Sequence, residues 1–542
     1  MSEPRADHVL RGPIVVAATA EGLETADAIG IAGDRVVAVG QAQDVLDAAA
    51  AGAAVTDARD AVVVPGLHDF HLHLAAMARA RLELRLDEAT SFDVLLGRVR
   101  EAHATLAAGE WLIGRGWHEA ALDHDRLGDL EAAIGERPAA LTSHDGHSLW
   151  ASAAALRATE IGAGSVDPAG GRIERRADGE PNGILREAAL LPVYGVAPRP
   201  RGDALAPALR AVIDELNAWG ITSATDAGDP DATSGAGPRA AMGDSFSTLL
   251  DLRSAITGRL RLTLNVPVDA IGAAAEMGLR SGTALEGGLR MGWVKVYGDG
   301  ALGSRTAALF EPYSCGDAPD AGILRYEPDR LAEIVRGARA AGIGLAIHAI
   351  GDRAVAVALD ALAGSARGPA TLPDRIEHAQ LVRVADRARF VDLDVTASVQ
   401  PIHAVADRDL VETCWQGRVT NAYAFRSLLV AGARLAFGSD APIENPNPWS
   451  GFHAATRRHA PRDGRDAWRP VDAVSPAATL AAYTAGPATA GDTPDLGHLR
   501  IGARADLAVL DIGLGALLAT GEGVADVRSR LTLVGGQTVH PG

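Results

Sequence analysis

Cysteine is scarce in this chain of 542 residues, and so are aromatic side chains and long apolar runs. Only Cys315 and Cys414 are present, in unrelated contexts, which indicates neither a disulfide framework nor a CxxC metal motif. The first residues lack a basic segment followed by an apolar core, and no run approaches the ~20 apolar residues of a membrane span. We therefore expect a cytoplasmic protein.

Blocks of basic residues are missing as well. The 51 Lys and Arg residues and 69 Asp and Glu residues are dispersed and give a formal net charge of −18. Such a surface repels nucleic acid and anionic membranes. We expect a small-molecule substrate, with neither nucleic acid nor a membrane as partner.

Short β segments occur at both ends of the chain, separated by Gly and Asp. They include "GPIVVAA" and "AIGIAGDRVVAVG" near the start and "LTLVGGQTV" near the end. This similarity predicts one small β-sandwich domain built from residues 1–64 and 485–542. The remaining residues, 65–484, then form a unit inserted between them.

Apolar strand-like runs alternate with helical stretches through this central unit, which is typical of a parallel sheet with crossover helices. We count eight such runs: "VVVPGLHDFHLH", "GITSATDAG", "LRLTLNVPV", "GWVKVYGDG", "GLAIHAIGD", "DRIEHAQ", "DVTASVQPIH" and "RLAFGSDAP". Eight is the number that a closed (β/α)8 TIM barrel requires. The interval from about 75 to 205, with helices and Gly-rich turns, is interpreted as an insertion after the first barrel strand.

Three histidines fall within six residues of the first run. Because side chains alternate along a strand, His71 and His73 should share one face and form a chelating pair. The same parity places His68 with Phe70 on the opposite, helix-facing side, where a structural role is expected. Asp69 shares the face of the pair and is a candidate to accept a hydrogen bond from a ligand imidazole.

Further potential ligands close other apolar runs. His348, His378 and Asp440 each lie near the end of a predicted strand. Any one of them alone is more simply a hydrogen-bonded core residue or a helix cap. Since strand ends converge on one mouth in a barrel, their joint occurrence favours a metal site.

Lys295 is an unusual residue in the apolar run "GWVKVYGDG". Burial of its ammonium group would cost free energy unless the group were paired or neutralised. An amine with a lowered pKa can take up carbon dioxide and give a carbamate that bridges two cations. The alternative is an ion pair with Asp299 or Asp226.

Several longer strings resemble the metal-dependent amidohydrolase superfamily, in the branch that contains N-substituted formamide deformylase. They are "PGLHDFHLHL", "VKVYGDGALGSRTAAL", "IHAIGDRAV", "RIEHAQLV", "SVQPIH", "GSDAPIENPNPWSG", "WLIGRGWHE", "DGHSLWASAAAL", "GEPNGILREAA" and "GARADLAVLD". The resemblance spans nearly the whole chain. It implies the same barrel and small β domain that the strand count predicts.

The resemblance also implies a centre of two divalent metal ions. His71 and His73 would hold one ion, His348 and His378 the second, carboxylated Lys295 would bridge them, and Asp440 would bind metal. Zinc suits a set of imidazole and oxygen ligands, although Mn²⁺, Fe²⁺ and Co²⁺ also accept them.

The catalytic role expected for Asp440 follows from this centre. A water between the two ions would have a pKa of about 7. Asp440 would accept its proton as hydroxide attacks a carbonyl, and would then deliver that proton to the leaving nitrogen. The expected reaction is hydrolysis of a C–N bond, of amide or formamide type and other than a peptide bond.

Four residues in loop-like settings of these strings are candidates for substrate binding, although a structural role is equally expected for each. They are Trp117, His147, Arg305 and His403. The histidines without comparable context are interpreted as surface or packing residues: His8, His103, His124, His459, His498 and His540.

Two other functions stay open at this point. A cyclic amidase, lactonase, esterase or deaminase would use the same scaffold, although the deaminases of this superfamily usually hold one metal and lack the lysine. A non-catalytic metal-binding scaffold is disfavoured because Asp440 is present. Barrels of this size often form homodimers, but no sequence feature here requires one.

Overall fold

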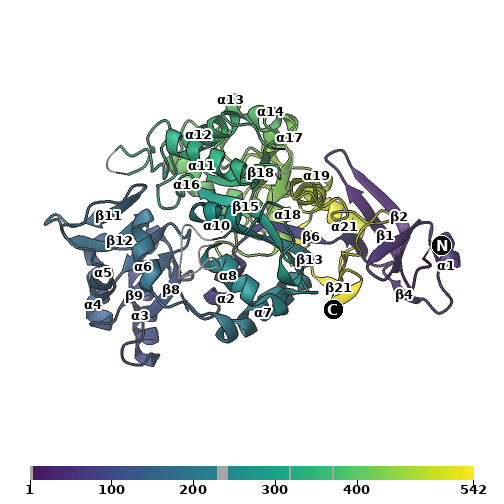
Figure 1. Cartoon of the computed structure of the whole chain (residues 1–542), viewed down its shortest axis with the longest axis horizontal. Coiled ribbons are helices and arrows are strands. Elements are labelled where there is room, and N and C mark those ends of the chain that lie inside the picture. The colour runs from purple at the N-terminus through teal and green to yellow at the C-terminus, as the bar shows by residue number, and fades with distance from the viewer. Residues whose placement is uncertain (1–3, 229–241, 317–318, 369–371) are drawn as a thin grey trace.

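A computed structural model describes residues 4–228, 242–316, 319–368 and 372–542. Three sheets follow one another across the molecule in Figure 1. A sheet near the N-terminus occupies one end, a parallel sheet surrounded by helices lies in the middle, and the sheet of the insertion occupies the other end. The cavity described below lies between the parallel sheet and the insertion.

The central sheet confirms the predicted barrel. Its eight strands are parallel and pair in the order β19-β18-β17-β16-β15-β14-β13-β6. Each overlaps one of the runs counted in the sequence: β6 (Leu67–Leu72), β13 (Ile221–Asp226), β14 (Arg261–Pro267), β15 (Arg290–Tyr297), β16 (Leu345–Ala349), β17 (Arg375–His378), β18 (Thr396–Val399) and β19 (Leu435–Phe437).

The two edge strands meet just beyond their ends and nearly close the barrel. The Asp440 N–H donates to the His71 carbonyl (2.7 Å), and the His73 N–H donates to the Ala441 carbonyl (2.8 Å). Glycine is required at position 438, because a Cβ there would lie 2.5 Å from the His71 nitrogen. These contacts bring Asp440 and the two histidines together although the chain separates them by more than 360 residues.

Helices cover the outside of the barrel and bury one face of each strand. Leu72, Val294, Val296 and Ile347 belong to a single apolar cluster with residues of these helices. The helices are α2 (Leu74–Ala80), α7 (Ala206–Ala218), α8 (Asp244–Asp251), α9 (Arg253–Ile256), α10 (Ile271–Glu276), α11 (Pro328–Ala340), α12 (Asp352–Ala363), α13 (Val384–Arg387), α14 (Arg389–Asp392), α15 (Pro401–Ala406), α16 (Arg408–Cys414), α17 (Phe425–Val430), α18 (Pro448–Arg457), α19 (Pro476–Ala482), α20 (Ala485–Ala490) and α21 (Leu514–Ala519).

Both ends of the chain contribute to a second sheet. Its order is β22-β21-β20-β5-β1-β2-β3, and β4 pairs with β1. The strands are β1 (His8–Ala18), β2 (Leu23–Ala32), β3 (Arg35–Gly40), β4 (Ala54–Asp57), β5 (Val62–Pro65), β20 (Leu507–Leu510), β21 (Ser529–Val534) and β22 (Gln537–His540), with α1 (Ala42–Ala48) packed on the sheet. Since only Gly66 separates β5 from β6, this sheet leads directly into the barrel.

The insertion contains a sheet that the sequence did not predict. Its order is β11-β12-β10-β9-β8-β7, and its inner strands supply part of the cavity wall. The strands are β7 (Leu84–Arg85), β8 (Leu112–Trp117), β9 (Ala139–Ser143), β10 (Ser148–Ala151), β11 (Gly171–Arg175) and β12 (Pro181–Glu187), accompanied by α3 (Phe92–Thr105), α4 (Asp129–Ile134), α5 (Ala153–Ala158) and α6 (Leu191–Val196).

The two cysteines form a disulfide, which corrects the sequence interpretation. Cys315, in the loop after β15, is bonded to Cys414 at the end of α16. Their sequence separation of 99 residues hid the pairing, since only the barrel brings the two segments together. The low cysteine count therefore gives no argument for a reducing compartment.

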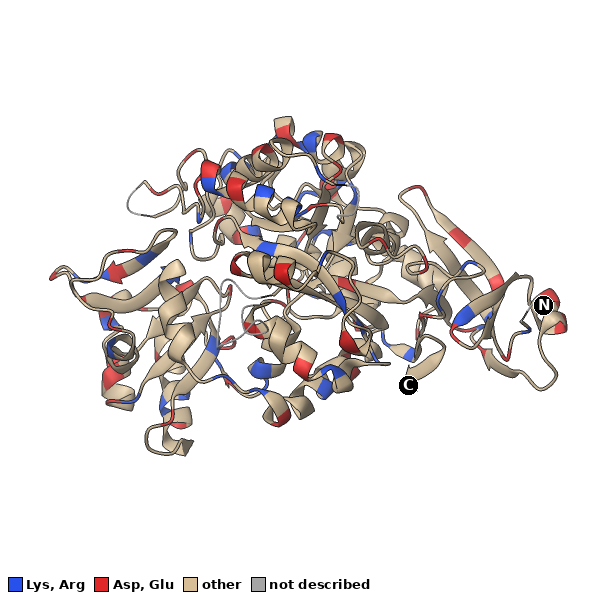
Figure 2. Cartoon of the chain, viewed as in Figure 1, with Lys and Arg blue, Asp and Glu red and all other residues tan. Residues whose placement is uncertain are grey.

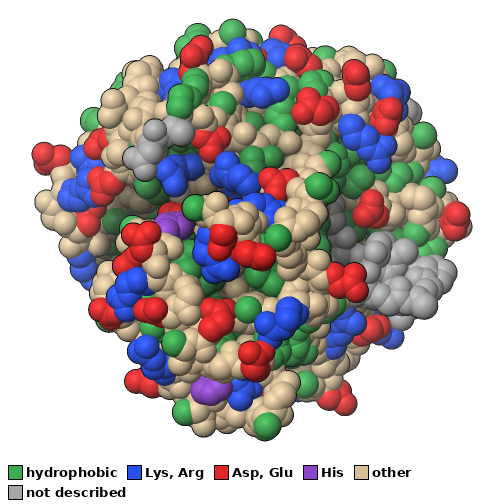
Figure 3. Space-filling model, turned by 90° about the vertical axis from the view of Figure 1, so that its left-hand side faces the viewer, with side chains coloured by type: hydrophobic (Ala, Val, Ile, Leu, Met, Phe, Trp, Pro, Cys, Tyr) green, Lys and Arg blue, Asp and Glu red, His purple; other side chains and the backbone are tan. Residues whose placement is uncertain are grey.

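The surface carries charges of both signs. Basic and acidic residues are scattered over all parts of the chain in Figure 2, and they are interspersed on the face of the insertion shown in Figure 3. Within the described ranges, no helix is both long enough and apolar enough to span a bilayer.

Candidate metal centre

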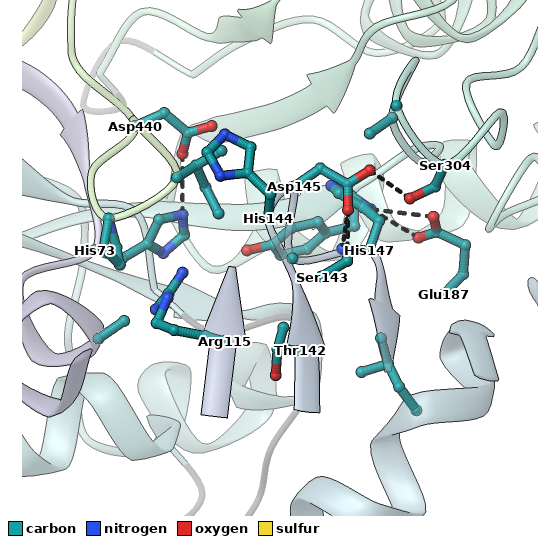
Figure 4. A pocket seen from close by; sticks show the side chains of 18 of the residues that line it. His73, Arg115, Thr142, Ser143, His144, Asp145, His147, Glu187, Ser304 and Asp440 are labelled. Atoms are coloured by element: carbon teal, nitrogen blue, oxygen red, sulfur yellow. Dashed lines mark hydrogen bonds and ion pairs between the residues drawn. The ribbon is translucent and has the colours of Figure 1, made fainter. Parts of the chain in front are cut away.

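The mouth of the barrel opens into a cavity of about 1080 Å³. Its floor contains the strand-end residues that the sequence singled out, and the insertion supplies much of its wall (Figure 4). The structure brings all six predicted metal-site residues to this mouth. His73, Lys295, His348, His378 and Asp440 line the cavity, while His71 lies fully buried beside them.

Asp440 is at the centre of the group. Its Oδ1 lies 3.3 Å from Nε2 of both His71 and His73, and its Oδ2 lies 3.3 Å from Nε2 of His403. His71, His378 and Asp440 each present a ligand atom within 4.8 Å of the others. The His348 ring adjoins that of His378, with ring centroids 4.4 Å apart. The four histidines therefore form one continuous cluster.

Each of these imidazoles is held by a partner on one ring nitrogen, which leaves the other nitrogen for the centre. Such partners fix the tautomer and the ring orientation of metal-binding histidines. The pairs are His71 Nδ1 with Glu377 Oε2 (2.5 Å), His73 Nδ1 with the Gly228 carbonyl (3.0 Å), His378 Nδ1 with Gln400 Oε1 (2.8 Å) and His348 Nε2 with the Gly300 carbonyl (3.2 Å).

Glu377 is a partner of the histidine cluster that the sequence interpretation missed. Its carboxylate accepts the His71 Nδ1 proton and is paired with Arg375, which is also fully buried. Asp69, the residue expected to do this, instead accepts the backbone N–H groups of His71 (3.3 Å) and Ser439 (3.0 Å). The motif "RIEH" could have indicated this role. It places a glutamate two residues after an arginine in a buried strand, where both charged side chains need partners.

The backbone is left-handed at two residues of the cluster. The φ angle is +70° at His378 and +59° at Asp440, a region that residues other than glycine seldom adopt. His378 ends β17 and Asp440 lies three residues after the end of β19, so a turn of the chain aims each side chain into the mouth. Backbone strain of this kind concentrates at functional sites.

Lys295 is buried, and its Nζ has no hydrogen-bond partner among the described residues. The ammonium lies 4.7 Å from the centre of the Tyr297 ring. Burial lowers the pKa of Lys295 to about 8, partly offset by the charges of Glu377 and Asp440. Lys295 is also the only lysine in the sequence.

Lys295 does not form the ion pair with Asp299 or Asp226 that was the alternative expectation. Asp299 accepts backbone N–H groups of Ala308, Ile350 and Gly351 at 2.8–3.0 Å. Asp226 accepts the Leu74 and Gly228 N–H groups and the Ser245 hydroxyl. Neither carboxylate pairs with the lysine.

The imidazole nitrogens and the carboxylate at the mouth are suited to bind cations. His71 Nε2 and His403 Nε2 are buried and face Asp440 at 3.3 Å without a hydrogen bond of good geometry. Burial alone would raise the pKa of Asp440, but the nearby imidazoles of His71, His403 and His73 outweigh this and hold the pKa well below its usual range. An ionised carboxylate beside imidazole lone pairs is a donor set for zinc and similar metals.

The position of His68 corrects the parity prediction. Its ring contacts Phe70, and Phe70 packs on Trp293, which shares a face of β15 with Lys295. His68 and Phe70 therefore point into the barrel, below the metal-site residues, and not toward the helices. The reason is a register shift in the pairing of β6 with β13 between Asp69 and Leu72, which breaks the alternation.

Three of the four residues expected to bind substrate line the cavity. They are Trp117, His147 and His403. The Trp117 indole N–H donates to the Leu141 carbonyl (2.7 Å), so only its ring faces the cavity. Burial alone would lower the pKa of His147, but the Glu187 carboxylate 3.0 Å away outweighs it and raises the pKa to about 9.

Arg305, the fourth, does not line this cavity. It lines a second, smaller cavity of about 460 Å³ next to Cys315, which shares Ser304 with the large cavity. The backbone at Arg305 is left-handed (φ +54°), and the N–H donates to the Leu302 carbonyl, so the turn points its side chain away while Leu302 and Ser304 line the large cavity.

The insertion adds Arg115, a polar group that the sequence interpretation passed over. Its side chain extends from β8 toward His73 (Figure 4) and has no hydrogen-bond or ion-pair partner in the described ranges. Burial lowers the pKa of Arg115, which nevertheless remains charged at neutral pH because arginine titrates so high. Alternation along β8 could not have indicated it, because the pairing of β8 with β9 shifts register between Arg115 and Trp117.

A protein-family model described as the amidohydrolase family matches residues 54–540. The chain belongs to this family. The resemblance inferred from the motifs is thus confirmed, and it places the chain among metal-dependent hydrolases of the amidohydrolase type.

Three proteins that are similar to this amidohydrolase each have a different name. Protein LONG AFTER FAR-RED 3 from Arabidopsis thaliana is 30% identical over 535 residues, covering 96% of this chain and 89% of the relative. The N-substituted formamide deformylase of Arthrobacter pascens is 28% identical and covers 90% of both chains. An uncharacterized metal-dependent hydrolase from Pyrococcus horikoshii OT3 superposes with a TM-score of 0.72 and 26% identity, covering 95% of this chain and 99% of that one.

Proposed function

We propose that this amidohydrolase hydrolyses a C–N bond of an amide- or formamide-type small molecule. The observation that carries the proposal is the convergence of four histidines and Asp440 around the buried, unpartnered Lys295. The similarity to an N-substituted formamide deformylase supports an acyl-type C–N bond as the target.

The ligand assignment is the one that the family resemblance implies, and the convergence of these side chains at the mouth supports it. His71, His73 and Asp440 would hold one divalent ion, and His348 and His378 a second, with zinc the expected metal. When bound, such ions lower the pKa of water and polarise a carbonyl oxygen. The outer partners, Glu377 among them, keep the ligand imidazoles in the required tautomer.

Lys295 would carry a carboxylate derived from carbon dioxide. Its free amine forms a new N–C bond with CO₂ and releases a proton, which gives a carbamate anion. Burial favours this reaction because it lowers the pKa of the amine to about 8 and so increases the fraction of free base. The product would replace an unpaired cation by an oxygen ligand in the middle of the site.

Asp440 would move the proton of the reaction. It accepts a proton from the attacking water and delivers it to the leaving nitrogen, so that the amine departs neutral. Its position suits both steps because it lines the cavity and its two oxygens face His71, His73 and His403. A side chain that serves as base and then as acid needs such access to both water and substrate.

The cavity wall would orient the substrate. Trp117 offers an apolar face and His147 a protonated imidazole next to His348. Arg115 would donate hydrogen bonds to a carbonyl or carboxylate oxygen of the substrate, since its guanidinium faces the cavity and makes no hydrogen bond or ion pair in the described structure, with the charge of Glu83 the strongest that acts on it.

A substrate panel tests the proposed function. We expect zinc-loaded protein to hydrolyse members of a set of N-formyl and N-acyl amines faster than matched lactams, lactones, esters and aminopurines. Faster turnover of a cyclic substrate or an ester would assign one of those reactions instead. Failure of metal-loaded protein on the entire panel would contradict an enzymatic role.

A further inference from the structure

A second cluster of potential metal ligands lies apart from the barrel mouth. It consists of His453, His459 and Glu522, whose ligand atoms lie within 4.8 Å of one another. His453 is on α18, His459 follows the end of that helix, and Glu522 begins a 3₁₀-helix at Glu522–Asp526. None of the three lines the large cavity, so this cluster is separate from the site described above.

His453 is the unusual member of the cluster. Its side chain is fully buried, and neither ring nitrogen has a hydrogen-bond partner of good geometry in the described structure, although the Gly521 backbone lies within reach of the ring. Buried polar groups are nearly always satisfied, because an orphaned one costs about 1–3 kcal/mol. A nitrogen lone pair of this ring is therefore available to bind a metal ion.

His459 and Glu522 are oriented toward the same point. The left-handed backbone of Arg458 (φ +60°) ends α18 and turns the chain, so that the rings of His453 and His459 meet edge to face with centroids 4.9 Å apart. His459 Nδ1 donates to the Ala460 carbonyl (3.0 Å), which leaves Nε2 with its lone pair 3.9 Å from Glu522 Oε1.

Glu522 is held by one of its two carboxylate oxygens. Oε2 accepts the Arg462 N–H (2.9 Å), while Oε1 faces His459 at a distance too long for a hydrogen bond. The side chain is half exposed, so the cluster is open to solvent on this side. The carboxylate thus has one oxygen held by a hydrogen bond and one that faces the imidazoles. This arrangement suits a carboxylate ligand of a metal ion.

We propose that His453, His459 and Glu522 form an additional binding site for a transition-metal ion such as zinc. Two imidazoles and one carboxylate, with a position left for water, are a ligand set that zinc accepts. Ligand atoms around tetrahedral zinc lie about 3.4 Å apart, so the cluster needs only a modest side-chain rotation to close. A simple ion pair of His459 with Glu522 would leave the buried His453 unsatisfied.

The proposed ion would connect two parts of the molecule. Helix α18 follows the β19 strand end that carries Asp440, whereas Glu522 lies in the segment between β20 and β21 of the terminal sheet. Metal binding would thus cross-link the barrel to the C-terminal segment. Because the ion would bind the folded chain only, it would stabilise the fold without taking part in the reaction.

Zinc titration of the full-length protein tests this site. The test compares the wild type with Glu522→Gln, a change at a half-exposed side chain, and His459→Gln, a change at a partly buried one. Glu522→Gln also retains an oxygen for the Arg462 N–H. The control is Glu333→Gln, another half-exposed glutamate, on α11 and paired with Arg330. Free zinc is set with a competing chelator, and bound zinc per chain is measured by elemental analysis.

The expected result is that one equivalent of zinc binds at least about tenfold more weakly in both test variants than in the wild type and the control. Zinc should also raise the melting temperature of the wild type and the control more than that of the test variants. Because the readout is a difference between variants, it does not depend on how many ions the barrel mouth holds. Identical zinc titrations in all four proteins would overturn the proposal.

Discussion

Replacement of Glu377 by glutamine should weaken metal binding at the barrel mouth and destabilise the fold. Hydrogen bonds to a charged acceptor contribute about 1.5–3 kcal/mol, and those between neutral groups about 0.5–1.5 kcal/mol. The His71 Nδ1 contact should therefore lose about 1–1.5 kcal/mol, which is about five- to tenfold in affinity. The change also leaves the buried Arg375 without its ionised partner, which costs up to ~3–5 kcal/mol of stability.

The assay separates these two effects with a matched control. Metal affinity is measured by competition with a chelator, and unfolding is followed in the presence of chelator so that metal does not contribute to stability. Asp374→Asn is the control, because Asp374 is a buried acid paired with Arg339 (2.8 Å) immediately before the same strand, away from the mouth. The control should lose stability and keep its metal affinity. Wild-type metal affinity in Glu377→Gln would refute the proposed role of the carboxylate.

The remaining predictions concern the site and the disulfide. Asp440→Asn should lower kcat by about 10²–10⁴-fold in samples whose metal content is verified, and near-native turnover would refute its role in proton transfer. Lys295→Met should hold fewer metal ions than the wild type by elemental analysis; equal content would show that the lysine is no ligand. Arg115→Met should raise KM about tenfold for substrates with a carboxylate and much less for uncharged ones, and equal effects would remove the proposed contact. Reduction of the Cys315–Cys414 disulfide should cost about 2–5 kcal/mol of stability, measured by denaturant unfolding with and without reductant, where equal midpoints would contradict it.

The barrel could be predicted from the sequence because its signals are local. Each strand is a short apolar run, and the polar residues that matter, such as His348 and Asp440, stand at the ends of these runs. Since parallel strands point the same way, their ends meet without further information. The number and positions of the barrel strands were predicted correctly for this reason.

Other features depend on contacts between distant segments or on backbone irregularities. Strand parity failed at His68 because a register shift in β6 interrupts the alternation. Glu377 and the disulfide partners could not be assigned, since their contacts span 306 and 99 residues. The left-handed turn at Arg305 points its side chain away from the large cavity that it was expected to line. The sheet of the insertion is formed by strand pairings that no sequence motif indicates.

A crystal structure of the zinc-loaded protein, with anomalous scattering data, tests the central claim most directly. The account predicts two anomalous peaks at the barrel mouth, one beside His71 and His73 and one beside His348 and His378. It also predicts carboxylate density continuous with Nζ of Lys295, between the two peaks. A single ion at the mouth together with an unmodified lysine would contradict the two-metal account.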